Sequence, residues 1–349
     1  MFHKAHFWVS HFLITTPIQH SHTLHHFQIT PKNSPKSYCN RNTNTTILAA
    51  YSNDLDAYDV NYLRSSIVFY NTYHFYGYTK FANIRFDVRD EEEIQYHSDL
   101  TSFNASFAAH MPDPSLGYAN SATGSDVFKV LQKFLNNKQA TICGALVYIV
   151  AKRYPNENAL TDLISQLRAN HVFVYIVAHD YPSGGTNPKA LFEVATKTNG
   201  FCVFNSGVNF WVSVDDLSDV NYRKYQFQSQ SFTVSGMGRL ELPVFQTPNP
   251  TEWSEQMLVV ITIQDHSLKN FISLNYTIES TDGSFVWTGP DQSSGWPRFG
   301  TGILAQPNLN GTTSYKWTID YHYSNSQPQI IETRLYSNFY HDFLPLPGN

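Results

Sequence analysis

The sequence predicts a doubly wound α/β domain with a mainly parallel sheet, followed by an all-β sandwich. Three observations support this fold class. From residue 45 to about residue 215, short apolar runs alternate with segments whose apolar residues recur at helical spacing. After about residue 219 the helical period disappears, and aromatic or β-branched runs separated by Gly, Asn, Asp and Pro replace it. The chain has 349 residues, which is ample for two domains.

The first part, residues 46–215, alternates between strands and helices. Strands are expected at residues 46–51, 81–88, near 100–107, 146–150, 171–177 and 201–204. Helices are expected at residues 54–70, 125–135, 160–167 and 187–199. Asn187-Pro188 is a strong helix start, because the missing N–H of proline costs nothing at the first helical position. Such alternation implies crossover connections and helices on both faces of the sheet.

The second part, residues 222–349, is expected to form the sandwich. Its predicted strands are residues 257–263, 271–279, 284–288, 313–323 and 329–336. Alternation places one aromatic or aliphatic set on a common face, namely Tyr315, Trp317, Ile319, Tyr321 and Tyr323. A second such set is Ile272, Leu274, Tyr276 and Ile278, which leaves Asn275 on the polar face.

Residues 1–45 show no sustained period and are dense in His, Pro and Asn. We expect a disordered or mis-started leader outside both cores. The alternative is metal binding by His20, His22, His25 and His26. The apolar run at residues 7–14 is interrupted and lacks a clean cleavage site, so it is a poor signal peptide. No run approaches the roughly 18 apolar residues of a membrane span.

Composition and charge exclude some classes of function. The chain is 42% hydrophobic and 15% charged, which excludes disorder throughout its length. Its formal net charge is -5 and no basic cluster occurs, so nucleic acid is not an expected partner.

The three cysteines, Cys39, Cys143 and Cys202, lack the spacing of a zinc or redox pair and allow one intrachain disulfide at most. The expected sheet order places a strand between Cys143 and Cys202, which disfavours that pair without excluding it. Acceptor motifs for N-glycosylation occur at Asn44, Asn104, Asn275 and Asn310. The two C-terminal motifs are expected to be exposed, as modification requires, although chance occurrence is the alternative.

The segment from Cys143 to Phe204 has the order strand, helix, strand and helix, and it ends in an Asn-Gly turn. It resembles the second half of von Willebrand factor A domains, which have a Rossmann-like α/β fold. The phrases YSNDL, KRYPNE and TNGF resemble divergent A-like domains of secreted nematode proteins of unknown function. The resemblance covers residues 45–215. It implies an extracellular binding or adhesion module with a protein or carbohydrate ligand, in extracellular matrix or host defence.

Domains of that family bind ligands through a metal-ion-dependent adhesion site, built from an Asp-x-Ser-x-Ser turn, a loop Thr and an Asp after the fourth strand. Laid on this sequence, the motif starts at Ala50, where the family has Asp, and Asp54 replaces its second Ser. Lys152 and Arg153 follow the fourth strand, where the family has the other Asp. The resemblance therefore implies a degenerate site that holds no metal ion.

We hypothesise that Lys152 pairs with Asp54, so that a fixed cation replaces the charge of the ion; the alternative is a simply solvated lysine. The carboxyl edge of the sheet is the expected ligand surface. The residues expected there are Ser52, Asn53, Asp54, Thr123, Lys152, Arg153 and the 179–187 loop. Ser183-Gly184-Gly185 within that loop is an ordinary glycine-rich connection or an anion-binding turn.

No catalytic or cofactor motif stands out. The patterns GxSxG, HExxH, GxxxxGK and GxGxxG do not occur in the sequence, so no nucleophile elbow, zinc protease helix or nucleotide loop is indicated. We therefore expect no cofactor and a non-enzymatic protein. The alternative is a secreted hydrolase whose catalytic groups assemble only in the fold.

Overall fold

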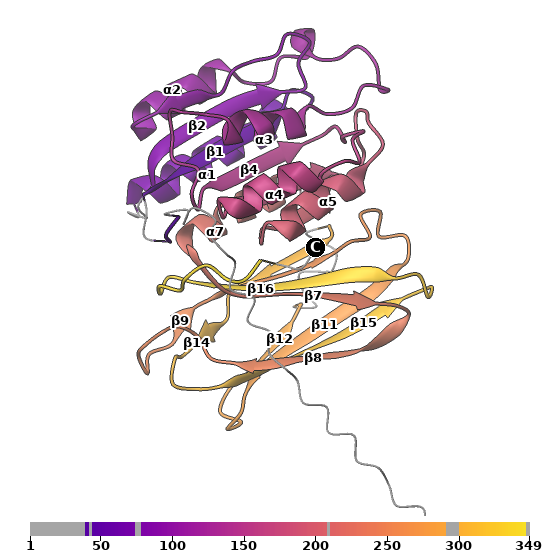
Figure 1. Ribbon diagram of the computed structural model, residues 1–349. Helices are drawn as coiled ribbons and strands as arrows, with labels where there is room; N and C mark the ends of the chain where they lie inside the picture. Colours follow the sequence, from indigo (N-terminus) through magenta and orange to yellow (C-terminus); the bar gives the residue numbers. More distant parts are fainter. Residues whose placement is uncertain (1–38, 42–43, 74–77, 208–209, 291–299, 347–349) are drawn as a thin grey trace, which may run out of the picture. The chain divides into compact units, whose positions relative to one another are not determined.

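The sequence folds into a six-stranded α/β sheet followed by a sandwich of two four-stranded sheets in the computed structural model (Figure 1). The structure describes residues 39–41, 44–73, 78–207, 210–290 and 300–346. Most of the segment expected to be a leader, including the four histidines at positions 20–26, lies outside these described residues.

The first sheet has the order β3-β2-β1-β4-β5-β6, in which only β3 runs antiparallel to its neighbour. Its strands are β1 (Thr45–Ser52), β2 (Tyr78–Phe86), β3 (Gln95–His97), β4 (Leu146–Ala151), β5 (Phe173–His179) and β6 (Cys202–Asn205). The order reverses between β1 and β4, which gives the topological switch point of a doubly wound sheet. The fold class predicted for this part is therefore confirmed.

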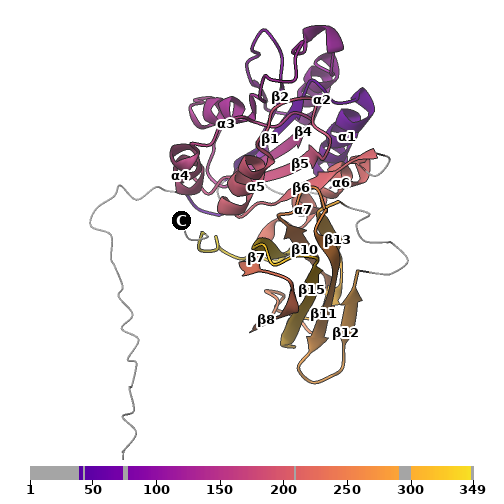
Figure 2. The same ribbon diagram turned by 90° about the vertical axis from the view of Figure 1, so that its right-hand side faces the viewer.

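Helices cover both faces of this sheet. They are α1 (Ala57–Tyr73), α2 (Leu100–Ala109), η1 (Pro114–Leu116), α3 (Val127–Leu135), α4 (Thr161–Ala169), α5 (Pro188–Lys197), α6 (Phe210–Asp216) and α7 (Asp219–Tyr222). Helices α3, α4 and α5 share one apolar core with the sheet, and α1, α2 and α6 share another. Figure 2 shows α3 and α4 on the side of the sheet opposite to α1 and α6.

The strand expected near residues 100–107 is wrong, because this segment is the helix α2. Asp99 caps it, since its side chain accepts a hydrogen bond from the N–H of Ser102 at 2.8 Å. Phe103 and Phe107 lie one helical turn apart and are both buried. The edge strand β3 instead lies just before α2, and helices α6 and α7 occur where the sequence indicated no helix.

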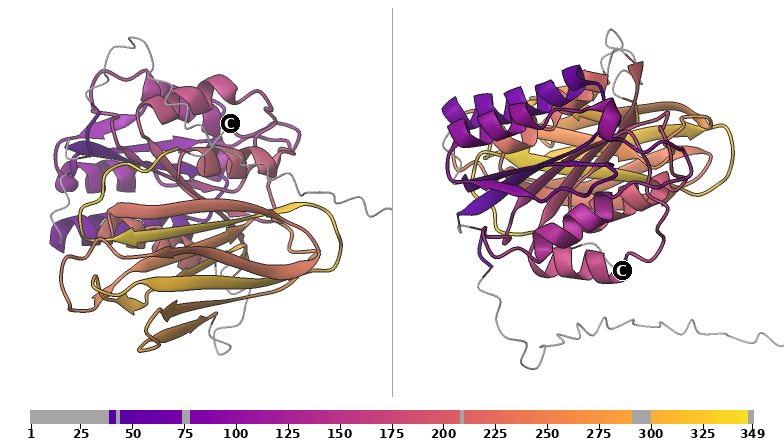
Figure 3. Two further views of the ribbon diagram at one scale, coloured as in Figure 1. Left: turned by 60° about the horizontal axis from the view of Figure 1, so that its bottom comes forward. Right: turned by 90° about the horizontal axis from the view of Figure 1, so that it is seen from above.

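The sandwich consists of the sheets β13-β10-β16-β7 and β12-β11-β15-β8, beside the short pair β14-β9 (Figure 3). Its strands are β7 (Tyr225–Val234), β8 (Met237–Phe245), β9 (Glu255–Gln256), β10 (Leu258–Ile263), β11 (Phe271–Ser280), β12 (Val286–Gly289), β13 (Gly302–Ala305), β14 (Asn308–Leu309), β15 (Tyr315–Tyr323) and β16 (Gln329–Ser337). The predicted sandwich is confirmed, although the strands β7 and β8 and the short strands β9, β13 and β14 are not among those predicted.

Alternation in the sandwich is mostly as expected. Trp317 and Ile319 are completely buried in the core between the sheets. Ile272 is an exception, with an exposed fraction of 51%, because the pairing of β11 with β15 shifts between Phe271 and Ser273. This bulge turns Ile272 away from the face that Leu274 and Tyr276 share.

Candidate functional site

The six residues predicted for the ligand edge follow the carboxyl ends of β1 and β4 or lie in the loop before α3. Parallel strands bring these ends to one edge of the sheet. The structure links Asp54, Thr123 and Arg153 directly, whereas Ser52 and Asn53 contact other loops and Lys152 stands apart from them. The contacts among these residues therefore differ from those expected, and ligand binding at this edge stays a prediction.

A buried ion pair between Arg153 and Asp54 forms the centre of this edge. The Nε of Arg153 donates to Oδ2 of Asp54 at 2.9 Å, and its Nη1 donates to the main-chain oxygens of Asn120 and Thr123 at 3.0 and 2.7 Å. The guanidinium carbon also lies 5.3 Å from the ring centre of Tyr118. Thr123 thus contributes its carbonyl oxygen, rather than a hydroxyl, to this pair.

The hypothesis that Lys152 pairs with Asp54 is wrong, because the partner of Asp54 is the next residue, Arg153. Alternate residues of a strand face opposite sides, and Ile149 and Ala151 of β4 face the same core as Ala50 of β1. Asp54 lies four residues after Ala50 and Arg153 lies two residues after Ala151, so both side chains leave the chain on this same face. Lys152 lies one residue after Ala151, so its side chain leaves on the opposite face. A fixed cation therefore does lie at this edge, and it is a guanidinium.

The loop after β5 closes over the ion pair. The hydroxyl of Ser183 donates to Oδ2 of Asp54, and the N–H of Ser183 donates to the carbonyl of Lys152 at 2.8 Å. The N–H of Gly185 donates to the carbonyl of Ser121 at 3.0 Å. These two N–H groups are used inside the protein, so the anion-binding turn considered for this segment gains no support.

Gly184 is required by the position of Arg153. A Cβ at this glycine would lie 2.1 Å from Nη1 of Arg153 and 2.7 Å from the carbonyl oxygen of Ser121. Both distances are far below van der Waals contact, so a larger residue would displace the guanidinium or the loop that carries Ser121.

Asp87, which the sequence did not indicate, forms a second carboxylate centre directly after β2. It is completely buried, and it accepts hydrogen bonds from the hydroxyl of Ser52 at 2.5 Å and from the N–H of Asp126 at 2.9 Å. Burial raises the pKa of Asp87 to about 7, although the bonds from Ser52, the Asp126 N–H and Ser125 oppose this shift. Asp87 thereby joins the ends of β1 and β2 to the start of α3.

Asn53 forms two hydrogen bonds to the loop that precedes η1. Its Nδ2 donates to the carbonyl of Asp113 at 2.9 Å, and its Oδ1 accepts from the N–H of Asp113 at the same distance. This reciprocal pair holds the loop before η1 against the end of β1. The amide of Asn53, Oδ2 of Asp54 and the carboxylate of Asp87 thus all bond to groups of the protein itself.

The groups that this edge presents to solvent lie beside the ion pair. Tyr181 is exposed over 73% of its surface, and Lys152 and His179 are half-buried. The pKa of His179 is lowered, first by burial and then by Lys152, although Asp180 opposes this shift. The Nδ1 of His179 accepts a hydrogen bond from the N–H of Tyr181 at 3.1 Å, which favours the neutral imidazole with its proton on Nε2.

The described residues contain no group of three His, Cys, Asp or Glu side chains that could hold a metal ion. Asp54, which stands where the family motif has its second Ser, contacts the guanidinium of Arg153. Whether the purified chain binds divalent ions stays a prediction. Within the same ranges, no helix is long and apolar enough to cross a membrane.

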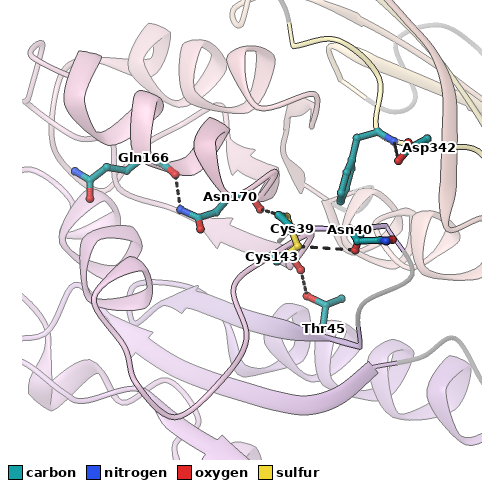
Figure 4. The surroundings of a disulfide bond; sticks show 8 residues. Cys39, Asn40, Thr45, Cys143, Gln166, Asn170 and Asp342 are labelled. Atoms are coloured by element: carbon teal, nitrogen blue, oxygen red, sulfur yellow. Dashed lines mark hydrogen bonds between the residues drawn. A yellow bond between two sulfur atoms is a disulfide. The ribbon is translucent and has the colours of Figure 1, made fainter. Parts of the chain in front are cut away.

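The disulfide joins Cys39 to Cys143, with a Cα–Cα distance of 5.2 Å (Figure 4). Cys202 is free and buried on β6, so the pair of Cys143 with Cys202 does not form, and β5 does lie between β6 and the strand β4 that Cys143 precedes. The last residues of the expected leader are therefore tied to the α/β part. Arg41 is also buried there, so at least residues 39–41 belong to a packed region.

The four glycosylation motifs differ in accessibility. Asn44 and Asn275 are exposed, and Asn275 lies on the outer face of β11 as expected. Asn310 is half-buried, and its Oδ1 accepts a hydrogen bond from the N–H of Thr313 at 2.9 Å, so its expected full exposure is wrong. Asn104 lies within α2, where its Oδ1 accepts from the guanidinium of Arg64.

A family described as a domain of unknown function (DUF7154) matches residues 230–338, within the sandwich. No curated protein matches the sequence. Among solved structures, a von Willebrand factor type A protein from Catenulispora acidiphila is 7% identical with a TM-score of 0.38, and the match covers 85% of this chain and 58% of that one. The doubly wound sheet resembles that fold.

Two further solved structures are similar at the same level. Proximal thread matrix protein 1 from the mussel byssus is 11% identical with a TM-score of 0.36, covering 56% of this chain and 50% of the other. The human COPII-coat protein Sec24c is 10% identical with a TM-score of 0.36, covering 85% and 44%. The chain thus spans about half the length of these structures.

Proposed function

We propose that the chain is a secreted, non-catalytic binding module that recognises a protein or carbohydrate ligand at the carboxyl edge of the α/β sheet without a metal ion. The observation that carries this proposal is the buried pair between Arg153 and Asp54. The pair puts a fixed positive charge beside Asp54, the carboxylate that stands at the second Ser of the motif, and this charge would repel a divalent cation at that place. The role in extracellular matrix or host defence belongs to the same proposal.

The occupied carboxylates support binding rather than catalysis. Asp54 is held by Arg153 and Ser183, and Asp87 is held by Ser52 and the Asp126 N–H. A general base needs a carboxylate that can reach a substrate proton. Rigid loops that present a few exposed side chains suit recognition of a partner surface.

The disulfide supports an extracellular location. Disulfides form and persist mainly in oxidising compartments, and the bond between Cys39 and Cys143 closes a loop over a sequence separation of 104. Asn44 and Asn275 are exposed, as glycosylation requires. Expression of the chain through a eukaryotic secretory pathway tests this part of the proposal. We expect the secreted chain to lose mass on treatment with an N-glycosidase. This mass loss should be smaller in Asn275→Gln and unchanged in the control Asn270→Gln, because Asn270 is not part of an acceptor motif. A secreted chain without any glycan would contradict this part of the proposal.

The binding surface is tested with the folded, oxidised chain on a panel of purified extracellular-matrix proteins and immobilised glycans. We expect Tyr181→Ala and Lys152→Ala to weaken binding to any recognised panel member at least tenfold, with or without EDTA. Tyr73→Ala is the matched control, because Tyr73 has a similar exposure of 70% at the far end of α1. Loss of binding in EDTA, equal loss in the control, or no binding across the panel would each contradict the proposal.

A further inference from the structure

Two cations meet at the amino edge of the α/β sheet, opposite the candidate ligand edge. Arg41 precedes β1 and has an exposed fraction of 7%, and Lys224 immediately precedes β7. The Nη2 of Arg41 donates to the main-chain oxygen of Lys224. Both side chains also contact Tyr225, with ring distances of 5.6 Å for Arg41 and 5.5 Å for Lys224. Two positive charges are thus held close together in a mostly buried place.

Aromatic rings surround these two charges. The guanidinium carbon of Arg41 lies 4.7 Å from the ring centre of Phe173 and 4.9 Å from that of Phe343, and Nζ of Lys224 lies 5.5 Å from that of Tyr78. Ring faces attract cations but accept no conventional hydrogen bond. The Nε of Arg41 is buried and has no hydrogen-bond partner among the described residues. A buried donor left in this state is costly, so it points to a bound acceptor.

A small cavity lies between the two cations. It has a volume of about 10 Å³ for the centre of a water-sized sphere. Its lining includes Asn40, Arg41, Thr45, Tyr78, Cys143 and Lys224. Figure 4 shows Asn40, Thr45 and Cys143 gathered around the disulfide at this place. The size suits one water molecule or one small ion, and it is too small for phosphate or sulfate.

We propose that this cavity binds one monovalent anion of the size of chloride, held by the side chains of Arg41 and Lys224. An anion between two cations replaces their repulsion by two attractions, and the low dielectric of a buried place strengthens this effect. A water molecule would satisfy Nε of Arg41 but would leave the repulsion unchanged. The site is separate from the ligand edge and does not depend on the function proposed for that edge.

The titration of Lys224 is consistent with this geometry. Burial, and then the charge of Arg41, lower the pKa of Lys224 to about 8. Burial also lowers the pKa of Arg41. A bound anion would favour the charged form of both groups and would raise the pKa of Lys224 again. The anion would thereby stabilise the charged form of Lys224 while it joins residues 39–41 to the strand β7.

Crystals of the unaltered chain grown in sodium bromide test the site directly. We expect an anomalous peak at the bromine absorption edge within hydrogen-bonding distance of Nε of Arg41. A density peak without anomalous signal would show that water occupies the cavity, and it would overturn the proposal. This measurement needs no variant, so it does not depend on whether a substituted chain folds.

Thermal unfolding at constant ionic strength tests the site in solution. We expect the melting temperature to rise saturably when chloride or bromide replaces gluconate, which is too large for the cavity. Lys224→Met should abolish this halide dependence. Lys316→Met is the matched control, since it removes one equally charged side chain from an exposed pair with Glu279. The same halide dependence in both variants, or a Lys224 that is neutral at pH 7 in saturating halide, would overturn the proposal.

Discussion

Asp54→Ala tests the ion pair at the ligand edge most sharply. The substitution leaves the guanidinium of Arg153, whose exposed fraction is 2%, without its carboxylate, and it leaves the hydroxyl of Ser183 with only the carbonyl oxygen of Lys152 at 3.4 Å as an acceptor. Breaking a buried pair by removing one partner costs about 3–5 kcal/mol. We expect the lower end, about 3 kcal/mol, because Arg153 keeps its hydrogen bonds to two carbonyl oxygens.

A double-mutant cycle with Arg153→Met separates the pair from other losses. Removal of both charges leaves no uncompensated ion, so the double variant should be more stable than the sum of the single losses predicts, by about 2 kcal/mol. Urea denaturation at neutral pH measures the free energy of unfolding of all four chains. Asp320→Ala is the control, since Asp320 pairs with Arg239 at 2.7 Å on the surface and should cost less than about 1 kcal/mol. An Asp54→Ala loss no larger than that of the control would refute the reasoning.

Two further predictions concern the surroundings of this pair, and a third concerns the disulfide at the opposite edge of the sheet. The pKa of Asp87 lies above its ordinary value, so the folded state binds more protons between about pH 4 and pH 7. The free energy of unfolding should therefore fall as the pH rises through this window, by up to about 1.4 kcal/mol per pH unit, and Asp87→Asn should flatten this dependence in pH-resolved urea titrations. Gly184→Ala should cost about 1–3 kcal/mol in the same assay, and less in Arg153→Met, because the added methyl group collides with the guanidinium. Cys39→Ser should destabilise the oxidised chain by about 2–5 kcal/mol, and a reducing agent should remove the difference between the two chains.

Periodicity predicted most of the α/β sheet because the interior strands are buried on both faces. All residues of β4 are buried, and their apolar run is readable without knowledge of the neighbouring strands. The helix α2 was mistaken for a strand because a ten-residue segment with Phe103 and Phe107 provides few apolar positions for a choice between periods. Its capping residue Asp99 was the available signal.

Strands β7 and β8, which are consecutive in the chain but belong to different sheets of the sandwich, are not predicted from the sequence for a different reason. Strand β7 contains Gln226, Gln228 and Gln230, and β8 is largely exposed, so neither has the alternation of a half-buried strand. Pairing with β16 and β15 gives these segments their structure. Such pairing joins residues between 70 and 112 positions apart, and no local pattern indicates it.

The partner of Asp54 could have been predicted from strand alternation. Counting outward from Ala50 by twos reaches Asp54, and counting from Ile149 by twos reaches Arg153, so both side chains leave their strands on the same side of the sheet. The side chain of Lys152 could reach Asp54 only if the backbone twisted after the end of β4. The contacts of Ser183 and Asp87 were beyond such counting. Ser183 lies in a loop whose course depends on what it packs against. Asp87 directly follows β2, but its φ of +62° redirects its side chain away from the alternation of that strand. Alternation therefore identifies partners one or two residues past a strand end where the backbone stays extended, whereas a positive φ or tertiary packing decides the others.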